Sequence, residues 1–117
     1  MIEVFKEFTF EAAHRIAPYS DVHGHSFSVE ITLRGAPDPE FGWVTSLSEV
    51  DPRVRLVQQA LDHKYLNDVE GLEVPSLENV ARWIWRRLDF PELHRVMIRR
   101  GLTGHGEGCA LYAPVEA

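Results

Sequence analysis

The sequence predicts an α+β domain in which two helices pack on one face of a four-stranded antiparallel sheet. Two observations lead to this prediction. Two segments near the middle of the chain repeat apolar residues at helical spacing, and the segments on either side alternate apolar and polar residues as strands do. The chain of 117 residues fits a single domain, residues 1–117, with a modest core.

Composition restricts the classes of function. The formal net charge of -6 argues against a nucleic-acid-binding protein, since binding phosphates needs clustered Lys and Arg. The single cysteine, Cys109, cannot form an internal disulfide, which suits a reducing cytosol. The N-terminus lacks a signal-peptide pattern, and no apolar segment approaches the roughly 20 residues that span a bilayer. We therefore expect a cytoplasmic protein without nucleic-acid or membrane partners.

The first half of the chain contains the clearest strand patterns. Residues 2–10 alternate imperfectly, and residues 27–34 alternate cleanly between apolar and polar side chains. Proline and aspartate predict a turn at residues 17–21 between them. After a second turn at residues 35–39, residues 41–44 predict a short resumption of the preceding strand, which together suggest an antiparallel hairpin.

The two helices are predicted from their caps and apolar stripes. Asp51 as the cap and Pro52 as the first helical residue start one helix, which ends at Leu61. Ser76 can cap the second helix, which Pro91 ends.

The remaining strands are expected after the helices. They cover residues 94–100 and 109–113, on either side of a glycine-rich segment, residues 101–108.

The pattern His14-x8-His23-Gly24-His25 carries the strongest chemical signal. In an extended segment alternate side chains share a face, so His23 and His25 point the same way. A turn can bring His14 beside them from an adjacent strand. Three imidazoles match the ligand set of an open catalytic zinc site, which leaves a fourth position for water or substrate. The alternative is two surface histidines and one hydrogen-bonded core histidine.

Asp62 and His63, directly after the first predicted helix, form a second candidate. A carboxylate beside an imidazole orients it and raises its basicity, which suits a proton donor or acceptor. The alternative is a helix C-terminus, which favours a protonated histidine. The dipeptide alone leaves both interpretations open.

Four segments of the sequence resemble the 6-pyruvoyl-tetrahydropterin synthase family, which includes the queuosine-pathway 6-carboxy-tetrahydropterin synthases. The match is collinear over most of the chain, and its most specific parts are His-x8-His-Gly-His and Leu-Asp-His-x-Tyr-Leu-Asn. The four segments are Phe8-Thr9-Phe10-Glu11-Ala12-Ala13-His14, His23-Gly24-His25-Ser26, Leu61 to Asp68 and Pro75 to Ala81.

This resemblance implies a fold, a cofactor and a chemistry. The implied fold is the tunnelling fold, whose four-stranded antiparallel sheets and paired helices assemble into trimeric barrels that stack as hexamers. The implied cofactor is Zn²⁺, held by His14, His23 and His25, where it polarises the side-chain oxygens of a dihydropterin. Asp62 and His63 match the family's proton-handling pair. The implied reaction removes triphosphate and rearranges or cleaves the side chain.

The sequence departs from the family pattern at substrate-specific positions. The family's general-base cysteine precedes its His-Gly-His, whereas this window reads Tyr19-Ser20-Asp21-Val22. The family's pterin-anchoring glutamate falls on Arg99-Arg100, and Glu107 is the nearest later acid, so we expect Glu107 to bind the substrate. Strand parity places Arg99 and Arg100 on opposite faces, so at most one lines the site. An arginine there would favour a carboxylate or phosphate group on the substrate.

Two hypotheses follow from these residues. The first is a zinc-dependent lyase acting on a dihydropterin triphosphate or a related pterin-like substrate, in which Tyr19, Asp21 or water replaces the cysteine. The second is a diverged paralogue, either an aldolase-type zinc enzyme with another substrate or a non-catalytic zinc protein that binds a heterocycle. The intact zinc and proton-transfer residues favour an enzyme, with weak or absent synthase activity on dihydroneopterin triphosphate.

Overall fold

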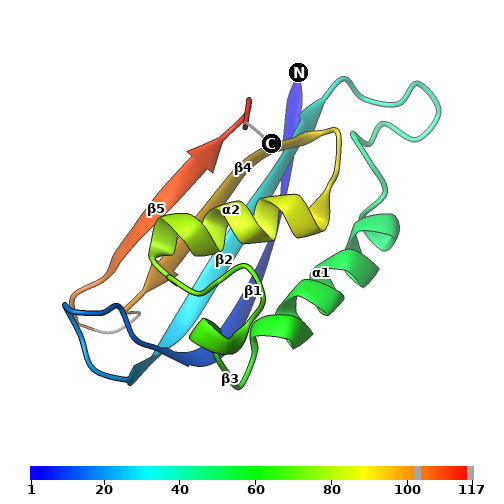
Figure 1. Ribbon diagram of the computed structural model, residues 1–117. Coiled ribbons are helices and arrows are strands. Elements are labelled where there is room, and N and C mark those ends of the chain that lie inside the picture. The colour runs from blue at the N-terminus through cyan, green and yellow to red at the C-terminus, as the bar shows by residue number, and fades with distance from the viewer. Residues whose placement is uncertain (102–103, 116–117) are drawn as a thin grey trace.

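The computed structural model describes residues 1–101 and 104–115, and it contains one sheet covered on one face by two helices (Figure 1). The strands lie in the order β3-β1-β2-β4-β5. The elements are β1 (Ile2–His14), β2 (His23–Gly35), α1 (Leu47–Leu61), β3 (Lys64–Tyr65), a 3-10 helix η1 (Leu66–Asp68), α2 (Leu77–Leu88), β4 (Leu93–Arg100) and β5 (Glu107–Tyr112).

The observed sheet corrects the predicted one. The α+β class and the helices on one face agree with the prediction, but the sheet has five strands and is mixed, not four-stranded and antiparallel. The additional strand is β3, which pairs in parallel with Ala12 and Ala13 of β1. The sequence pattern predicts a loop here because a strand of two residues is too short to show an alternation.

β1 and β2 form a long hairpin that positions the histidines. Both strands have 13 residues, and they pair without interruption from Ile2 with Gly35 to His14 with His23. β1 therefore reaches residue 14 rather than 10, and β2 includes His23 and His25 at its start, ahead of the cleanly alternating residues 27–34. The consecutive alanines Ala12 and Ala13 hide the alternation in the sequence, although Ala12 is buried.

α1 begins at Leu47, about one turn before the predicted start, so Asp51 and Pro52 lie inside the helix. Val50 is fully buried and extends the apolar stripe toward the N-terminus, which favours the additional turn. Asp51 does not cap the helix. Its Oδ1 instead lies 2.7 Å from Nζ of Lys6, and this ion pair joins α1 to β1.

Residues 41–44 do not form the predicted strand. The carboxylate of Asp38 accepts hydrogen bonds from two backbone N–H groups of this loop, and the N–H of Asp38 donates to the carbonyl of Trp43. Gly42 has a φ of 78°, a conformation outside the extended range. β2 consequently pairs with β1 and β4 and not with this segment.

α2 begins at the predicted cap, where Oγ of Ser76 accepts a hydrogen bond from the N–H of Asn79. The helices and the sheet bury the core between them. Its fully buried members include Phe10, Phe27, Val29, Ile31, Leu33, Val50, Leu61, Ile84, Leu88, Val96 and Ile98. None of the helices in the described residues is long and apolar enough to cross a membrane.

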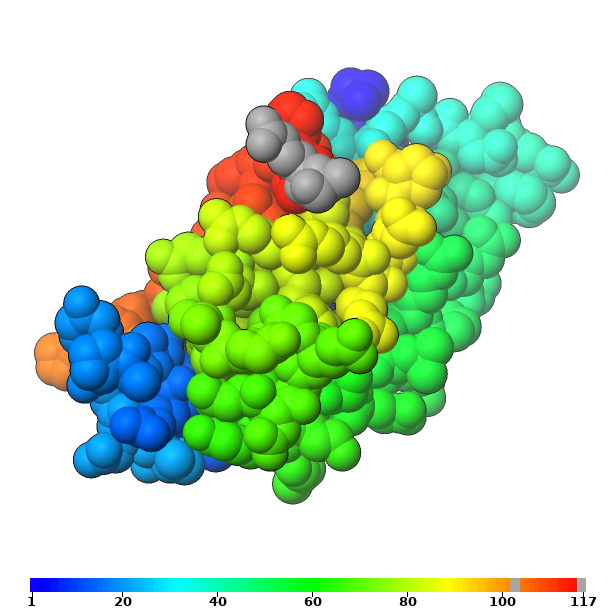
Figure 2. Space-filling view, viewed as in Figure 1, coloured from blue at the N-terminus to red at the C-terminus, as the bar shows by residue number. Residues whose placement is uncertain are grey.

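The molecule is elongated, and the histidines lie at one end of it. Figure 2 shows the helix-covered face, with residues 15–22 at one end beside the segment that links β3 to α2, and residues 36–46 at the other. Residues 15–22 connect the last residue of β1 to the first residue of β2. The end formed by this connection is therefore the place to examine for a site.

Candidate metal centre and proton-transfer pair

The hairpin register brings three histidines together at the end of the sheet. His14 pairs with His23 across the two strands, and His25 pairs with Ala12. One nitrogen of each ring lies within 4.8 Å of the others, so these residues could hold a metal ion. His14 is buried, with 1% of its surface exposed, whereas His25 is half-buried and His23 is exposed. The set is thus anchored in the core and open on one side.

Backbone carbonyls determine which ring nitrogens face the centre of the cluster. Nδ1 of His14 donates to the carbonyl of Pro75 at 3.1 Å, and Nδ1 of His23 donates to the carbonyl of Asp21 at 2.7 Å. A carbonyl can only accept, so both Nδ1 atoms carry the proton in the neutral rings. The two Nε2 atoms then present lone pairs to each other at 3.1 Å. Metal-binding histidines typically have this kind of support.

The arrangement fits a bound divalent cation. Two facing lone pairs repel each other unless a cation lies between them. Tetrahedral zinc, with Zn–N bonds of about 2.0–2.1 Å, separates two ligand nitrogens by roughly 3.3 Å. Nε2 of His25 is buried and has no hydrogen-bond partner within the described residues, an arrangement that costs free energy. A metal ion would remove both penalties.

The surroundings favour the neutral imidazoles that metal binding needs. Burial lowers the pKa of His14, and the nearby His23 and Arg100 lower it further, against the hydrogen bond to Pro75, which raises it. Burial also lowers the pKa of His25, with Arg100 as the next contribution. Both rings are therefore unprotonated at neutral pH.

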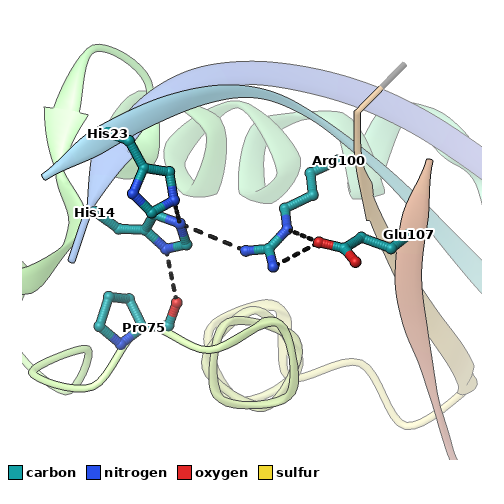
Figure 3. Close-up of polar contacts among 5 residues, drawn as sticks. All are labelled: His14, His23, Pro75, Arg100 and Glu107. Carbon is teal, nitrogen blue, oxygen red and sulfur yellow. Dashed lines mark hydrogen bonds and ion pairs between the residues drawn. The ribbon is translucent and has the colours of Figure 1, made fainter. Parts of the chain in front are cut away.

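Arg100 reaches the cluster from β4, as Figure 3 shows. Its Nη1 lies 3.5 Å from Nε2 of His14, and its Nε and Nη2 lie 2.8 and 2.7 Å from Oε1 of Glu107. Arg100 and Glu107 face each other across β4 and β5. Arg99 is exposed, in agreement with the predicted parity, so only Arg100 of the two lines the cluster. The carboxylate of Glu107, expected from the sequence to bind substrate, is thus held beside the cluster by Arg100.

Asp62 and His63 lie where α1 ends, beside β1. Oδ1 of Asp62 accepts a hydrogen bond from the N–H of Glu11 at 2.9 Å, and the N–H of His63 donates to the carbonyl of Glu11 at 2.6 Å. His63 has a φ of 59°, which is uncommon for a residue other than glycine and costs about 1–3 kcal/mol. Oδ2 of Asp62 is 3.5 Å from Nε2 of His63, whose side chain is 79% exposed. The backbone is fixed, and the imidazole is accessible.

One chain does not bring this pair into contact with the histidine cluster. In the described residues, the polar contacts of His63 are with Asp62 and Glu11 only. An open hollow of about 680 Å³ is lined by Glu11, His25 and His63, among others. The pair and the edge of the cluster therefore border the same surface depression.

Cys109 lacks the properties of a general base. Cys109 is half-buried on β5 and packs against the core. Burial raises the pKa of its thiol, which stays protonated at neutral pH. Of the other candidates, Tyr19 is 89% exposed, and Asp21 is exposed and contributes its carbonyl to His23. Among the described residues, neither side chain makes a hydrogen bond or ion pair with the cluster.

Two contacts of His14 were not predicted from the sequence, one with Pro75 and one with Arg100. The carbonyl of Pro75 cannot be recognised as a partner of His14 from sequence, because a backbone acceptor has no residue-type signal. The contact of Arg100 with His14 could have been found from the sequence, because strand parity places one of the two adjacent arginines on the face of the cluster. The register of β4 on β2 decides which one it is.

Comparison with known proteins finds similar chains among pterin synthases and an aldolase. The family model described as 6-pyruvoyl tetrahydropterin synthase matches residues 3–101. The 6-carboxy-5,6,7,8-tetrahydropterin synthase of Synechocystis is 37% identical over 115 residues, covering 86% of this chain and 87% of that protein. The dihydroneopterin monophosphate aldolase of Pyrococcus furiosus is 34% identical over 82 residues, covering 68% of each chain. The structure of Caenorhabditis elegans 6-pyruvoyl tetrahydropterin synthase superposes with a TM-score of 0.83 at 26% identity, covering 96% of this chain and 95% of that one.

Proposed function

Because the chain belongs to the 6-pyruvoyl tetrahydropterin synthase family, we propose that it is a zinc-dependent lyase acting on a dihydropterin triphosphate or a related pterin-like substrate. The observation that carries the proposal is the cluster of His14, His23 and His25, whose nitrogens converge within 4.8 Å. Three imidazole ligands leave one position of a tetrahedral site open for substrate. Zn²⁺ bound there would supply Lewis-acid polarisation of a substrate oxygen.

The protein side chains contribute orientation and proton transfer. Pro75 and Asp21 fix the rings of His14 and His23 through their carbonyls. Nε2 of His63 faces Asp62 at 3.5 Å, a distance that is too long for a good hydrogen bond and suits an ion pair. In this role Asp62 orients the imidazole, and Nδ1 of His63 exchanges a proton with the substrate.

We also propose that a neighbouring subunit completes the site. His63 is exposed and, within the described part of the chain, does not contact the cluster. The sheet has β3 and β5 as its edges, and large apolar side chains are exposed on the surface, including Ile2, Phe5, Trp43 and Tyr112. Assembly into trimeric barrels stacked as a homohexamer would pair the edges and cover such side chains.

Glu107 is the proposed substrate-binding residue. Arg100 contacts Oε1 of its carboxylate, so Oε2 remains to accept hydrogen bonds. The amide and amino N–H groups along the edge of a pterin ring are donors of the kind that a carboxylate accepts.

Aldolase-type cleavage is the second candidate function. It is favoured because Cys109, whose pKa is raised by burial, is not a thiolate base, whereas Asp62 and His63 are retained. The aldolase of Pyrococcus furiosus, 34% identical over 82 residues, is consistent with this reaction. A polarised carbonyl and an acid-base imidazole are sufficient for carbon–carbon cleavage next to a hydroxyl group.

Two inactive variants would test both the function and the shared site. His23→Ala should lose metal and His63→Ala should keep it, and each should lose turnover. Release of triphosphate from dihydroneopterin triphosphate reports the synthase-type reaction. Release of an aldehyde from dihydroneopterin monophosphate reports the aldolase-type reaction. If the site lies between subunits, co-refolding the two variants one to one should restore about a quarter of wild-type activity by random pairing.

Three results would contradict these proposals. Full turnover in His63→Ala would make the Asp62–His63 pair structural. If the co-refolded oligomers of His23→Ala and His63→Ala have no activity, the catalytic groups of each site come from a single chain. A monomer in light scattering at micromolar concentration would exclude the hexamer and the shared site together.

A further inference from the structure

Arg100 has a hydrogen-bond donor that is poorly used. Its Nε and Nη2 are held by Oε1 of Glu107 at 2.8 and 2.7 Å. Its Nη1 faces Nε2 of His14 at 3.5 Å, which is a weak contact at best. The side chain is 21% exposed and is directed at the cluster, as Figure 3 shows.

Metal binding would take away the acceptor of this donor. Nδ1 of His14 donates to Pro75, so Nε2 is the nitrogen that would give its lone pair to a cation. Among the described residues, Nη1 of Arg100 would then have no acceptor, and it would lie beside a divalent cation of the same sign. The neutral imidazoles carry no charge, and Glu107 offsets only one positive charge. An anionic oxygen between the cation and the guanidinium would satisfy the donor and reduce the repulsion.

We propose that Arg100 is a specificity-determining residue that binds an anionic oxygen of the substrate, from a carboxylate or a phosphate group, beside the histidine cluster. This inference rests on the proposed metal site. It assigns two different tasks to the ion pair, since Glu107 accepts from N–H groups of the ligand and Nη1 of Arg100 donates to its anionic group. Arginine suits this task because its planar fork keeps one arm on Glu107 while the other arm points to the ligand.

The test uses Co²⁺ in place of Zn²⁺, because the visible absorption of Co²⁺ reports ligands that enter an open position. The Co²⁺-loaded protein is titrated with inorganic phosphate and, separately, with acetate. Replacing Arg100→Gln should weaken anion binding by about ten- to a hundredfold, the usual effect of losing a charge-assisted hydrogen bond. Arg99→Gln is the matched control, since it removes the same charge from the neighbouring, exposed position, and its affinity should stay within about twofold of wild type.

A second variant should move the affinity in the opposite direction. Glu107→Gln removes the carboxylate that neutralises Arg100, so phosphate should bind several-fold more tightly than in wild type. A loss of folding cannot tighten binding, so opposite effects at the two partners exclude a general structural defect. A larger effect of Arg100→Gln on phosphate than on acetate assigns the site to a phosphate group, and the reverse assigns it to a carboxylate.

The outcomes separate this inference from the metal proposal. If wild-type protein binds Co²⁺ and Arg100→Gln binds both anions as tightly as Arg99→Gln does, the role of Arg100 is refuted and the metal site stands. If folded wild-type protein, checked by circular dichroism, binds no Co²⁺, both proposals fail. If Co²⁺ binds and neither anion changes its spectrum, Arg100 serves only to position Glu107.

Discussion

His23→Ala should abolish the stabilisation of the protein by zinc while leaving the metal-free protein nearly as stable as before. His23 is the exposed member of the cluster, so its removal creates no core cavity. The variant loses one hydrogen bond, from Nδ1 to the carbonyl of Asp21. A hydrogen bond of this kind contributes about 1 kcal/mol to the free energy of unfolding.

The expected zinc effect is much larger than that loss. At a free zinc concentration a hundred times the dissociation constant, binding stabilises the folded state by about 2.7 kcal/mol. For a domain of this size each kcal/mol raises the melting temperature by about 4 °C, so wild-type protein should gain roughly 11 °C. Since two imidazoles hold zinc poorly, the variant should gain less than about 2 °C at the same zinc concentration.

The assay is thermal unfolding followed by circular dichroism, with and without zinc, and with bound metal measured after dialysis. His63→Ala is the control because it removes another exposed imidazole from outside the cluster, and it should keep the full zinc shift. A shift of wild-type size in His23→Ala would show that the three histidines are not the ligand set, whatever its activity.

Two further predictions concern substrate binding and pH. Calorimetric titration of a dihydropterin into wild-type and Glu107→Gln protein should show at least tenfold weaker binding in the variant, and unchanged tight binding would rule out Glu107 as the anchor. In the metal-free protein, burial lowers the pKa of His14 and His25 below the unfolded value near 6.5, so the unfolded chain binds more protons. Its free energy of unfolding, measured by urea titration, should therefore fall as the pH drops from about 7 to 5. An equal free energy of unfolding at pH 7 and pH 5 would contradict the burial of these two histidines.

Local sequence patterns predicted most of the fold, because strand alternation and helix capping depend on residues that are close in sequence. Period-two alternation located the core parts of β1 and β2, and the Ser76 cap located the start of α2. The errors arose where a contact that the apolar pattern does not record decides the structure. The loop at residues 41–44 is held by Asp38, and β3 exists only because β1 lies beside it.

The candidate site could be predicted in part for the same reason. The cluster of His14, His23 and His25 could be predicted because residue type and strand parity together indicate it. The ion pair of Arg100 with Glu107 depends on the register of β4 with β5, which a single sequence does not reveal. The separation of His63 from the cluster is likewise a property of the packed chain.

The pairing of β1 with β2 has a consequence for how such centres can vary among proteins. All three histidines stand on one hairpin, and the strands hold them in place through main-chain hydrogen bonds. The eight residues that separate His14 from His23 in sequence are a connection, and closing a longer one would cost little, since each doubling of length adds only about 0.6 kcal/mol. A shift of pairing by a single residue would instead turn His23 and His25 to the opposite face. Insertions within residues 15–22 that spare Asp21 should therefore be tolerated, whereas deletion of Gly24 should destroy the centre.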